Sequence, residues 1–451
     1  MQRERLGSRL GFILLSAGCA IGIGNVWKFP YMVGQNGGGA FVLIYLFFLV
    51  IIGVPVLTME FALGRAAQKS PVRLYQELEP EGSKWHLHGY VAMAGNYLLM
   101  MFYTTVAGWM LRYFIATAKG DFVGRDAVGV KNFFDEMKAE PISMLIYVAI
   151  VVIIGFGVCS IGVQNGLERI TKVMMLALLV IMIVLAINSI FLDGGASGLE
   201  FYLKPDFARM KDIGVGTVVV NAMNQAFFTL SLGIGSMAIF GSYINKDRAL
   251  LGEAVNVAAL DTFVAISSGL IIFPACFAYG VQPDSGPSLI FITLPNIFNN
   301  IPMGRLWGSL FFVFMSFAAL STVLAVFENI ISCTIDLTGW SRKKTCVING
   351  IVMFVLSVPC VLGFNVWRSF EPLGAGTDIM DLEDFIVSNI LLPIGALVFV
   401  IFCVFRYGWG WDKFIAETNE GSGAKVKNWM RGYMTFVLPV IVVVIFIMGI
   451  M

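Results

Sequence analysis

Two hydrophobic stretches of the chain are interrupted by paired glycines: Gly18-Cys-Ala-Ile-Gly-Ile-Gly-Asn25 and Leu230-Ser-Leu-Gly-Ile-Gly-Ser236. Each lies within a segment apolar enough to cross a bilayer. Glycine costs about 1 kcal/mol in a helix interior, so paired glycines favour local unwinding. Unwound backbone at membrane depth is tolerated where it lines a cavity, and it can bind ions or a carboxylate there. The matched pair indicates a secondary transporter built from inverted repeats. Close helix packing of the Gly-xxx-Gly kind is the alternative.

The composition is that of a membrane protein, with 58% hydrophobic and 13% charged residues and a mean hydropathy of +0.83. We therefore predict an all-α membrane protein with eleven transmembrane helices of about 20 residues or more. The predicted spans are 10–35, 40–64, 88–116, 141–160, 166–191, 214–243, 248–279, 305–336, 345–364, 384–405 and 430–451.

Lys and Arg are concentrated in the segments that share a side of the membrane with the N-terminus. This distribution predicts a cytoplasmic N-terminus and a C-terminus outside. Arg3, Arg5 and Arg9 lead directly into the first span, so a cleaved signal peptide is not expected. The net charge of +1 gives no reason to expect nucleic acid. Isolated cysteines and the lack of glycosylation sequons favour a bacterial inner membrane, and no obligate protein partner is evident.

The outer segment from 280 to 304 is unusually apolar for an exposed loop, as in Leu289-Ile-Phe-Ile-Thr-Leu-Pro295. We expect it to fold back into the outer mouth and to act as a lid. The alternative is a structural plug that does not move.

Charged groups within spans are expensive, and they are candidates for function. Glu60 could accept hydrogen bonds from N–H groups that a broken helix leaves unpaired, and a proton relay is the minority alternative. Asp261 could ligate a monovalent cation, or it could be a protonated acid that caps another helix. Ser321 and Thr322 are adjacent hydroxyls, which in a membrane helix more often bond to their own helix carbonyls.

An enzyme is poorly supported, because neither a nucleophile motif nor a phosphate loop nor a metal-spaced cysteine set is present. An ion channel is the better rival, since broken helices and buried polar groups also form selectivity filters. A non-transporting amino-acid receptor is a third interpretation.

Six stretches give the chain a specific resemblance: Arg9-Leu-Gly-Phe, Gly22-Ile-Gly-Asn-Val-Trp-Lys-Phe-Pro-Tyr31, Asn36-Gly-Gly-Gly-Ala-Phe41, Glu60-Phe-Ala-Leu-Gly-Arg65, Gln225-Ala-Phe-Phe-Thr-Leu-Ser-Leu-Gly-Ile-Gly235 and Phe291-Ile-Thr-Leu-Pro295. With them the chain resembles the neurotransmitter:sodium symporter family, in its prokaryotic amino-acid branch. The resemblance implies the leucine-transporter fold. Its first inverted repeat would be residues 1–191, its second 214–405, and 406–451 would form an inner loop and helix 11.

The resemblance further implies two sodium sites. The first would use the Ala20 carbonyl, Asn25, Thr229, Asp261 and the carboxylate of the substrate. The second would use the carbonyls of Gly18, Ile21 and Ala318 and the hydroxyls of Ser321 and Thr322.

The same resemblance implies an amino-acid site at the two broken helices. The substrate carboxylate would meet Gly22, Gly24 and the Tyr103 hydroxyl, and its ammonium would meet backbone carbonyls. The whole substrate set is Ala20, Gly22, Gly24, Leu99, Tyr103, Phe228, Thr229, Ser231, Ile234, Thr322 and Val326, with Glu60 and Gln225 as polar support. Ile234 and Val326 replace bulkier residues of relatives, which favours large hydrophobic or aromatic substrates.

Several positions depart from the pattern of the family. The outer gate would pair Lys28, in place of an arginine, with Asp384, and lysine lacks the planar fork. The inner gate would pair Arg3 with Asp336 near Tyr243, with Leu6 in place of an aromatic residue. In helix 5, Gly166 is followed ten residues later by Leu176 rather than by proline.

Taken together, the residues and the resemblance predict a sodium-coupled symporter that imports neutral amino acids by alternating access. Independence of chloride is expected too. The serine that binds the anion in chloride-dependent relatives is Ala265 here, and Asp261 stands where most relatives have asparagine. The spacing of four places both on one helix face, so the Asp261 carboxylate could replace the anion.

Overall fold

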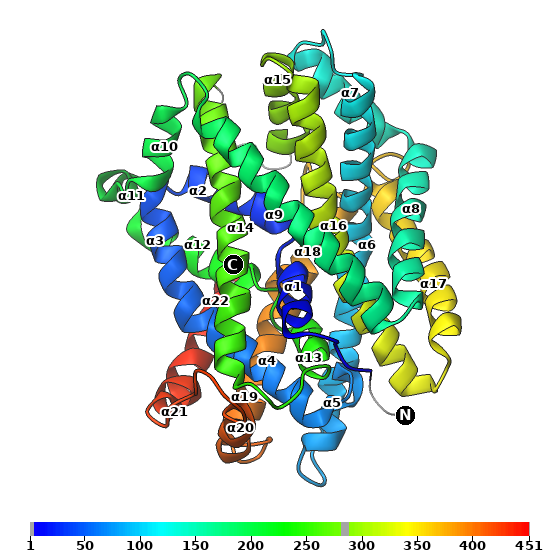
Figure 1. Ribbon diagram of the computed structural model, residues 1–451, viewed down its shortest axis with the longest axis vertical. Coiled ribbons are helices and arrows are strands. Elements are labelled where there is room, and N and C mark those ends of the chain that lie inside the picture. Colours follow the sequence, from blue (N-terminus) through cyan, green and yellow to red (C-terminus); the bar gives the residue numbers. More distant parts are fainter. Residues whose placement is uncertain (1–3, 281–287, 451) are drawn as a thin grey trace.

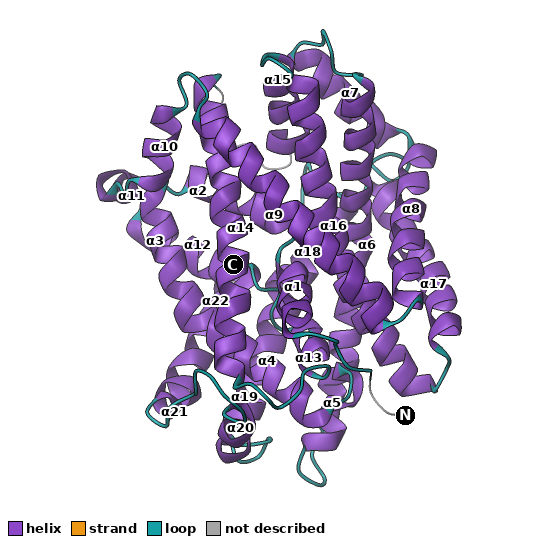
Figure 2. Ribbon diagram, in the orientation of Figure 1, coloured by secondary structure: helices purple, strands orange, loops and turns teal. Residues whose placement is uncertain are grey.

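The computed structural model describes residues 4–280 and 288–450, and these are arranged as a bundle of helices (Figure 1). Within the described residues the only β-type pairing is an isolated bridge between Arg248 and Ser422. Figure 2 shows helices throughout, joined by short loops at the two ends of the bundle. The prediction of an all-α protein is correct.

Nine helices of the described chain are long and apolar enough to cross a membrane. They are Gly39–Ala67 (α3 and α4), His86–Lys119 (α6), Pro141–Ser160 (α8), Val163–Ile190 (α9 and the turn before it), Leu250–Ala278 (α14), Gly304–Thr338 (α16), Arg342–Gly363 (α17), Ile379–Val404 (α18 and α19) and Met430–Ile450 (α21 and α22). Each matches one predicted span within a few residues.

The remaining two predicted spans are the glycine-broken ones. The first consists of α1 (Arg9–Ala20) and the helix Gly24–Gln35, which meet at an angle of 58°. The second consists of α12 (Val215–Phe228) and α13 (Ser236–Gly241), with non-helical backbone at 229–235 between them.

Glycine is required at the second break because the backbone there turns left-handed. Gly233 has a φ of +103°, and a Cβ atom on it would overlap the Leu392 carbonyl of α19 (Leu392–Val404). Ser231 has a φ of +51°, which is uncommon for a residue with a side chain. The break is therefore held in place by the surrounding helices, since local preference alone would not produce it.

Four spans and the short helical segment Leu289–Asn299 contain a wider π-helical turn that ends just before a proline. An example is Leu49–Gly53, followed by Pro55 near the start of α4 (Val54–Ala67). The same arrangement precedes Pro30, Pro295, Pro393 and Pro439. Proline has no N–H and crowds the carbonyl four residues earlier, so widening the turn lets the helix continue.

The expected lid is partly helical and is packed into the outer end of the bundle. A turn at Leu289–Thr293 leads into α15 (Leu294–Asn299), and the side chain of Phe291 is fully buried. Its ring stacks on Phe134 and meets Tyr113 edge-on, with centroid distances of 5.1 and 4.9 Å. The part of the loop at 281–287 lies outside the described residues. Whether the segment moves stays a prediction.

The most deeply buried span is α16, which packs against α1, α6 and α9. The first break lies beside α16, and the second lies beside α6, which packs against α16. The bundle thus brings unpaired backbone groups and the hydroxyl-bearing face of α16 together at its centre.

Candidate ion and substrate site

Asn25, Thr229 and Asp261 meet at the centre of the bundle, although they come from three separate elements. The Asn25 side-chain amide donates to Asp261 Oδ1 at 2.7 Å, and the Thr229 hydroxyl donates to Asp261 Oδ2 at 2.9 Å. All three side chains are buried. The Asn25 Oδ1 accepts from the Gly22 N–H at 3.3 Å on the other side of the amide. The cluster thus brings together a carboxylate, a hydroxyl and an amide, whose oxygens are of the hard kind that a sodium ion takes.

A second group of oxygens surrounds the end of α1. Ser321 Oγ lies 3.4 Å from the Ile21 carbonyl, and Thr322 Oγ1 lies 3.3 Å from the carbonyls of both Gly18 and Ile21. The Ala318 carbonyl is 2.9 Å from Ser321 Oγ. The distances to Gly18 and Ile21 are long for hydroxyl hydrogen bonds. Five oxygens thus converge here, and among them only Ser321 and Ala318 form a hydrogen bond of ordinary length, so the group could ligate a small cation.

The hydroxyl pair bonds to its own helix, as hydroxyls in membrane helices often do, and it also faces the carbonyls at the end of α1. Ser321 bonds to the Ala318 carbonyl of its own helix, and it also faces the break in the first span. The sequence alone could not choose between these roles, because the second depends on where α1 ends.

Gly22 lies at the break with little room for a side chain. A Cβ atom there would be 2.5 Å from Tyr103 Oη and 2.9 Å from Thr322 Oγ1. Gly24 differs, because a Cβ atom on it would meet nothing within 4 Å. The N–H of Ile23 donates to Tyr103 Oη at 3.1 Å. Backbone N–H groups and a phenol beside the open side of Gly24 could bind a carboxylate.

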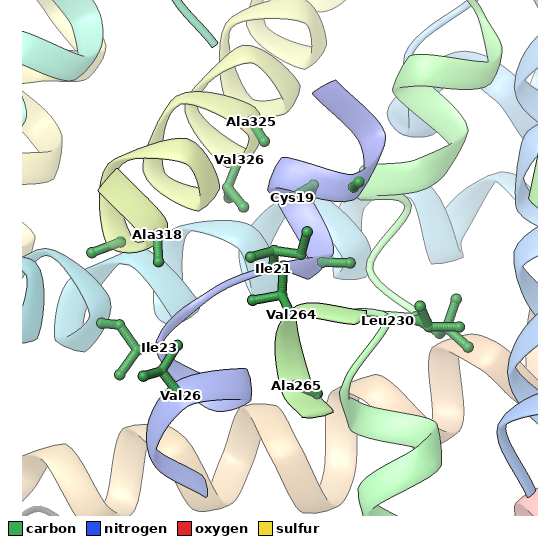
Figure 3. Packing of buried hydrophobic residues seen from close by; sticks show 14 of the residues in the cluster. Cys19, Ile21, Ile23, Val26, Leu230, Val264, Ala265, Ala318, Ala325 and Val326 are labelled. Carbon is green, nitrogen blue, oxygen red and sulfur yellow. The ribbon is translucent and has the colours of Figure 1, made fainter. Parts of the chain in front are cut away.

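Figure 3 shows the extended backbone at Ile21 passing close to Val326 and Ala318 of α16 and to Val264 and Ala265 of α14. The remaining residues of the expected pocket come from three elements. Leu99 and Tyr103 are one turn apart on α6, Thr322 and Val326 are one turn apart on α16, and Phe228, Ser231 and Ile234 lie at the second break. Leu99, Tyr103, Phe228 and Ser231 are half-buried, whereas Ile234 and Val326 are buried.

Buried polar groups hold the second break from outside the pocket. The Gly233 N–H donates to Glu60 Oε1 at 2.7 Å, which is the structural arrangement expected for Glu60. Asn96 of α6 donates to the Ile234 carbonyl at 2.9 Å and accepts from Ser236 at 3.1 Å. Gln225 is buried on α12, and the structure gives its Oε1 no hydrogen-bond partner.

The expected outer pair is not formed in this conformation. Among the described residues no ion pair joins Lys28 to Asp384, since the Lys28 ammonium lies 4.9 Å from the Phe228 ring centroid instead. Asp384 accepts from Ser388 at 2.7 Å. Each gate residue thus has another partner in this conformation.

The N-terminal segment is hydrogen-bonded to the start of helix 5. Glu168 accepts from the Gly7 N–H at 2.7 Å and from the Ser8 hydroxyl at 2.8 Å, and Gly11 packs against the same carboxylate. Glu4 accepts from the Val163 N–H at 2.7 Å. Helix 5 is therefore bound to the segment that precedes the first span.

The inner-gate residues are placed only in part. Arg3 lies outside the described residues, and Asp336 accepts from the Ser70 N–H at 2.8 Å. Tyr243 donates to Glu328 at 2.6 Å, and its carbonyl accepts from the Leu6 N–H. In helix 5, α9 (Arg169–Ile190) runs through Leu176 without a break, and Gly166 lies in the π-helical turn before it.

Comparison with known proteins relates the chain to one family of transporters. The model of the sodium:neurotransmitter symporter family matches residues 3–125 and 119–451. The chain belongs to that family. It is 33% identical to an uncharacterized sodium-dependent transporter of Bacillus subtilis, YhdH, over 98% of this chain and 96% of the relative. It is 25% identical to the sodium-dependent serotonin transporter of Drosophila melanogaster, over 100% of this chain and 76% of the relative.

Among solved structures, the chain resembles that of MhsT in complex with L-phenylalanine. The TM-score is 0.88 and the sequence identity 37%, over 99% of this chain and 100% of the other. The symporter family and its transporter relatives make this chain a sodium-dependent, multi-pass membrane transporter and not an enzyme.

Several residues that shape this symporter were missed in the sequence. Glu328 is fully buried within the span α16, where Arg342 pairs with it, and the cost of charge in a span should have drawn attention to it. Asn96 could have been noticed for the same reason, because a polar amide within a span is also costly, although less so than a charge. Glu168 and Ser268 gave none, because Glu168 lies at a span end and Ser268 acts through a single bond of 2.7 Å to the Asn25 carbonyl.

Proposed function

We propose that this transporter imports neutral L-amino acids together with sodium by alternating access, with a preference for large hydrophobic or aromatic side chains. The observation that carries the proposal is the environment of Gly22. The backbone there leaves no room for a side-chain carboxylate beside Tyr103 and Thr322. A substrate must therefore bring its own carboxylate to the Ile23 N–H and the Tyr103 hydroxyl.

The two oxygen clusters support two sodium sites. Asn25, Thr229 and Asp261 form the first with the carbonyl of Ala20, and the carboxylate of the substrate would complete it. Gly18, Ile21, Ala318, Ser321 and Thr322 form the second. Because one ligand of the first site belongs to the substrate, binding of ion and amino acid would be mutually dependent. The inward membrane potential would add about 2.3 kcal/mol per charge per 100 mV to import.

Chloride independence follows from the charge of Asp261. Its carboxylate lies at the first oxygen cluster, and Ala265, one turn further along α14, is buried and offers no hydroxyl. A fixed carboxylate can offset the charge of sodium as a bound anion would. We further propose that the chain resides in a bacterial inner membrane with its N-terminus in the cytoplasm, since Lys and Arg favour that side.

Uptake of labelled amino acids into proteoliposomes tests this function. We expect phenylalanine, tyrosine, tryptophan or leucine to accumulate when an inward sodium gradient is imposed, and not when sodium is replaced by choline. Tyramine and serotonin should compete more weakly, because they lack the carboxylate. Better competition by the amines would contradict the proposed substrate class.

The same vesicles separate the rival functions. Sodium conductance at channel rates without substrate would favour a channel. Saturable binding without counterflow of substrate across the bilayer would favour a receptor.

A further inference from the structure

A groove of about 600 Å³ runs along the outside of the bundle between α8 and α17. Both helices lie at the right edge of Figure 1, away from the two breaks. Each contributes residues three or four apart, from Ala149 to Ser160 on α8 and from Lys343 to Phe354 on α17. This spacing places one face of each helix on the groove.

Glycines and one aromatic pair give the groove its depth. A Cβ atom on Gly157 would meet nothing within 4 Å, and one on Gly350 would just touch Phe156 at 3.6 Å. Phe156 stacks on Phe327 of α16, with centroids 4.0 Å apart, and forms the floor of the groove. Ile153 is 70% exposed and stands at the rim. The wall is therefore smooth, apolar and open to the hydrocarbon of the membrane.

The length of the groove matches one leaflet of a bilayer. The stretch from Ala149 to Ser160 covers about 16 Å at 1.5 Å per residue, roughly half of a hydrocarbon core of about 30 Å. A spanning helix of a second copy would need a groove of twice this length. An acyl chain of a phospholipid needs this length and no more.

A single cation marks one end of the groove. Lys343 is exposed there, and no ion pair within the described residues engages it. Its neighbours are occupied, since Arg342 pairs with Glu328 and Glu4, and the Lys344 ammonium lies 4.5 Å from the Trp340 ring centroid. The contact of Arg342 with Glu4 also places this end on the side of the N-terminal segment.

We propose that this groove is a binding site for one anionic phospholipid of the leaflet that faces the N-terminus. The acyl chain lies between α8 and α17 over Phe156, and the phosphate meets the Lys343 ammonium. A basic residue at the membrane surface favours an anionic lipid by about 1 kcal/mol, which is about fivefold in occupancy.

Native mass spectrometry of the full chain tests the charge at the end of the groove. The protein is reconstituted in equal amounts of dioleoylphosphatidylglycerol and dioleoylphosphatidylcholine, extracted in mild detergent, and weighed with the lipid that it retains. We expect one retained lipid, with phosphatidylglycerol favoured about fivefold. Lys343→Gln should abolish this preference, whereas the matched variant Lys344→Gln should keep it. Equal retention of both lipids by the wild type would overturn the proposal.

A second variant tests the groove itself. Gly157→Leu has room to fold, because nothing stands within 4 Å of its Cβ atom, and it would fill the groove. We expect it to lose most of the retained lipid of either kind. Gly432→Leu, on another membrane helix and also without neighbours within 4 Å, should retain it.

Gel filtration and thermal unfolding show whether each variant is folded, and the observed mass shows its oligomeric state. Undiminished lipid on a folded Gly157→Leu would refute the site. A wild-type dimer that this variant dissociates would replace the proposal with an interface between copies of the chain.

Discussion

Asn25 donates to the Asp261 carboxylate at 2.7 Å and so ties the break of the first span to α14. Thr229, at the second break, donates to the other oxygen of the same carboxylate at 2.9 Å. One buried side chain thus joins both broken spans to an unbroken helix. An ion bound by the Asp261 carboxylate would compete with these two hydrogen bonds, which would link ion binding to the positions of both breaks and of α14.

Replacing Asp261 with asparagine should weaken sodium-driven uptake. The change removes a charged ligand, and a charge-assisted contact contributes about 1.5–3 kcal/mol. We expect the sodium concentration for half-maximal uptake to rise about tenfold or more. The double variant with Ala265→Ser should then respond to chloride, measured as uptake in chloride against gluconate. Wild-type uptake that collapses in gluconate would refute the role of Asp261.

Replacing Thr322 with alanine should raise the sodium requirement for substrate binding. Its hydroxyl is one of five oxygens around the end of α1, and alanine removes it. Loss of one neutral ligand costs about 1 kcal/mol, which corresponds to roughly a fivefold increase in the sodium concentration needed for half-maximal binding. Thr322→Ser keeps the hydroxyl and is the control. Equal sodium dependence of the two variants, measured by scintillation proximity binding, would count against the second site.

The two glycines of the first break should respond differently to alanine. Gly22→Ala places a methyl group 2.5 Å from Tyr103 Oη, so Tyr103 must move and substrate affinity should fall. Gly24→Ala adds the same atom where nothing lies within 4 Å, and it should be close to wild type. Binding of labelled phenylalanine or leucine measures both. Similar losses in the two variants would mean that substrate affinity depends on the conformational freedom of both glycines, and not on the room around a Cβ atom.

Glu168 should control access to the inner side of the protein. Glu168→Ala removes the acceptor for the Gly7 N–H and the Ser8 hydroxyl, so the N-terminal segment should detach more often. A cysteine at the half-buried position 6, Leu6→Cys, leaves the Gly7 N–H and the Ser8 hydroxyl in place and should then react faster with a membrane-impermeant maleimide added to the N-terminal side. Glu200→Ala, at an exposed ion pair with Lys204, is the control and should leave the labelling rate unchanged. No acceleration in the Glu168 variant would show that other contacts hold the segment.

Arg65 should be sensitive even to a conservative replacement. Its fully buried guanidinium donates to the Glu417 side chain at 2.6 Å, to the Arg248 carbonyl at 2.7 Å and to the Glu417 carbonyl. Arg65→Lys cannot make all three bonds and should lower the thermal midpoint by roughly 4 °C or more. Lys246→Gln removes a half-exposed partner of the same Glu417 and should change the thermal midpoint little.

The fold could be predicted from the sequence because the bilayer imposes length and composition on every span. Within the described residues, nine predicted spans correspond to helices long and apolar enough to cross a membrane, and a tenth corresponds to the bent pair around Gly22. The eleventh corresponds to α12 and α13 on either side of Gly233. The backbone conformation at the breaks could not be predicted from length and composition. The left-handed turn at Ser231 depends on packing against other helices, and apolar periodicity carries no information about it.

For the site, too, the sequence predicted some residues and not others. Asp261 and Glu60 stood out because charge within a span is costly, and the likeness to the family supplied the residues that meet them. The partner of Lys28 was not predictable, because a cation near the pocket can settle on an aromatic face or a carboxylate at similar cost. Glu328 shows that the rule of costly charge was applied too narrowly. It obeys the rule as well as Asp261 does, and it pairs with an arginine from the next span.

Pro55 has one further consequence for the last helix of the chain. A proline has no N–H to offer the carbonyl four residues earlier, and here that carbonyl is Ile51, to which the Tyr433 hydroxyl donates. Apolar helices in a bilayer can slide along one another at little cost, since every depth offers similar contact. A polar bond at one depth acts as a stop. Pro55 leaves the Ile51 carbonyl free, and Tyr433 binds it. The proline of one span thus fixes the depth of the last span relative to it.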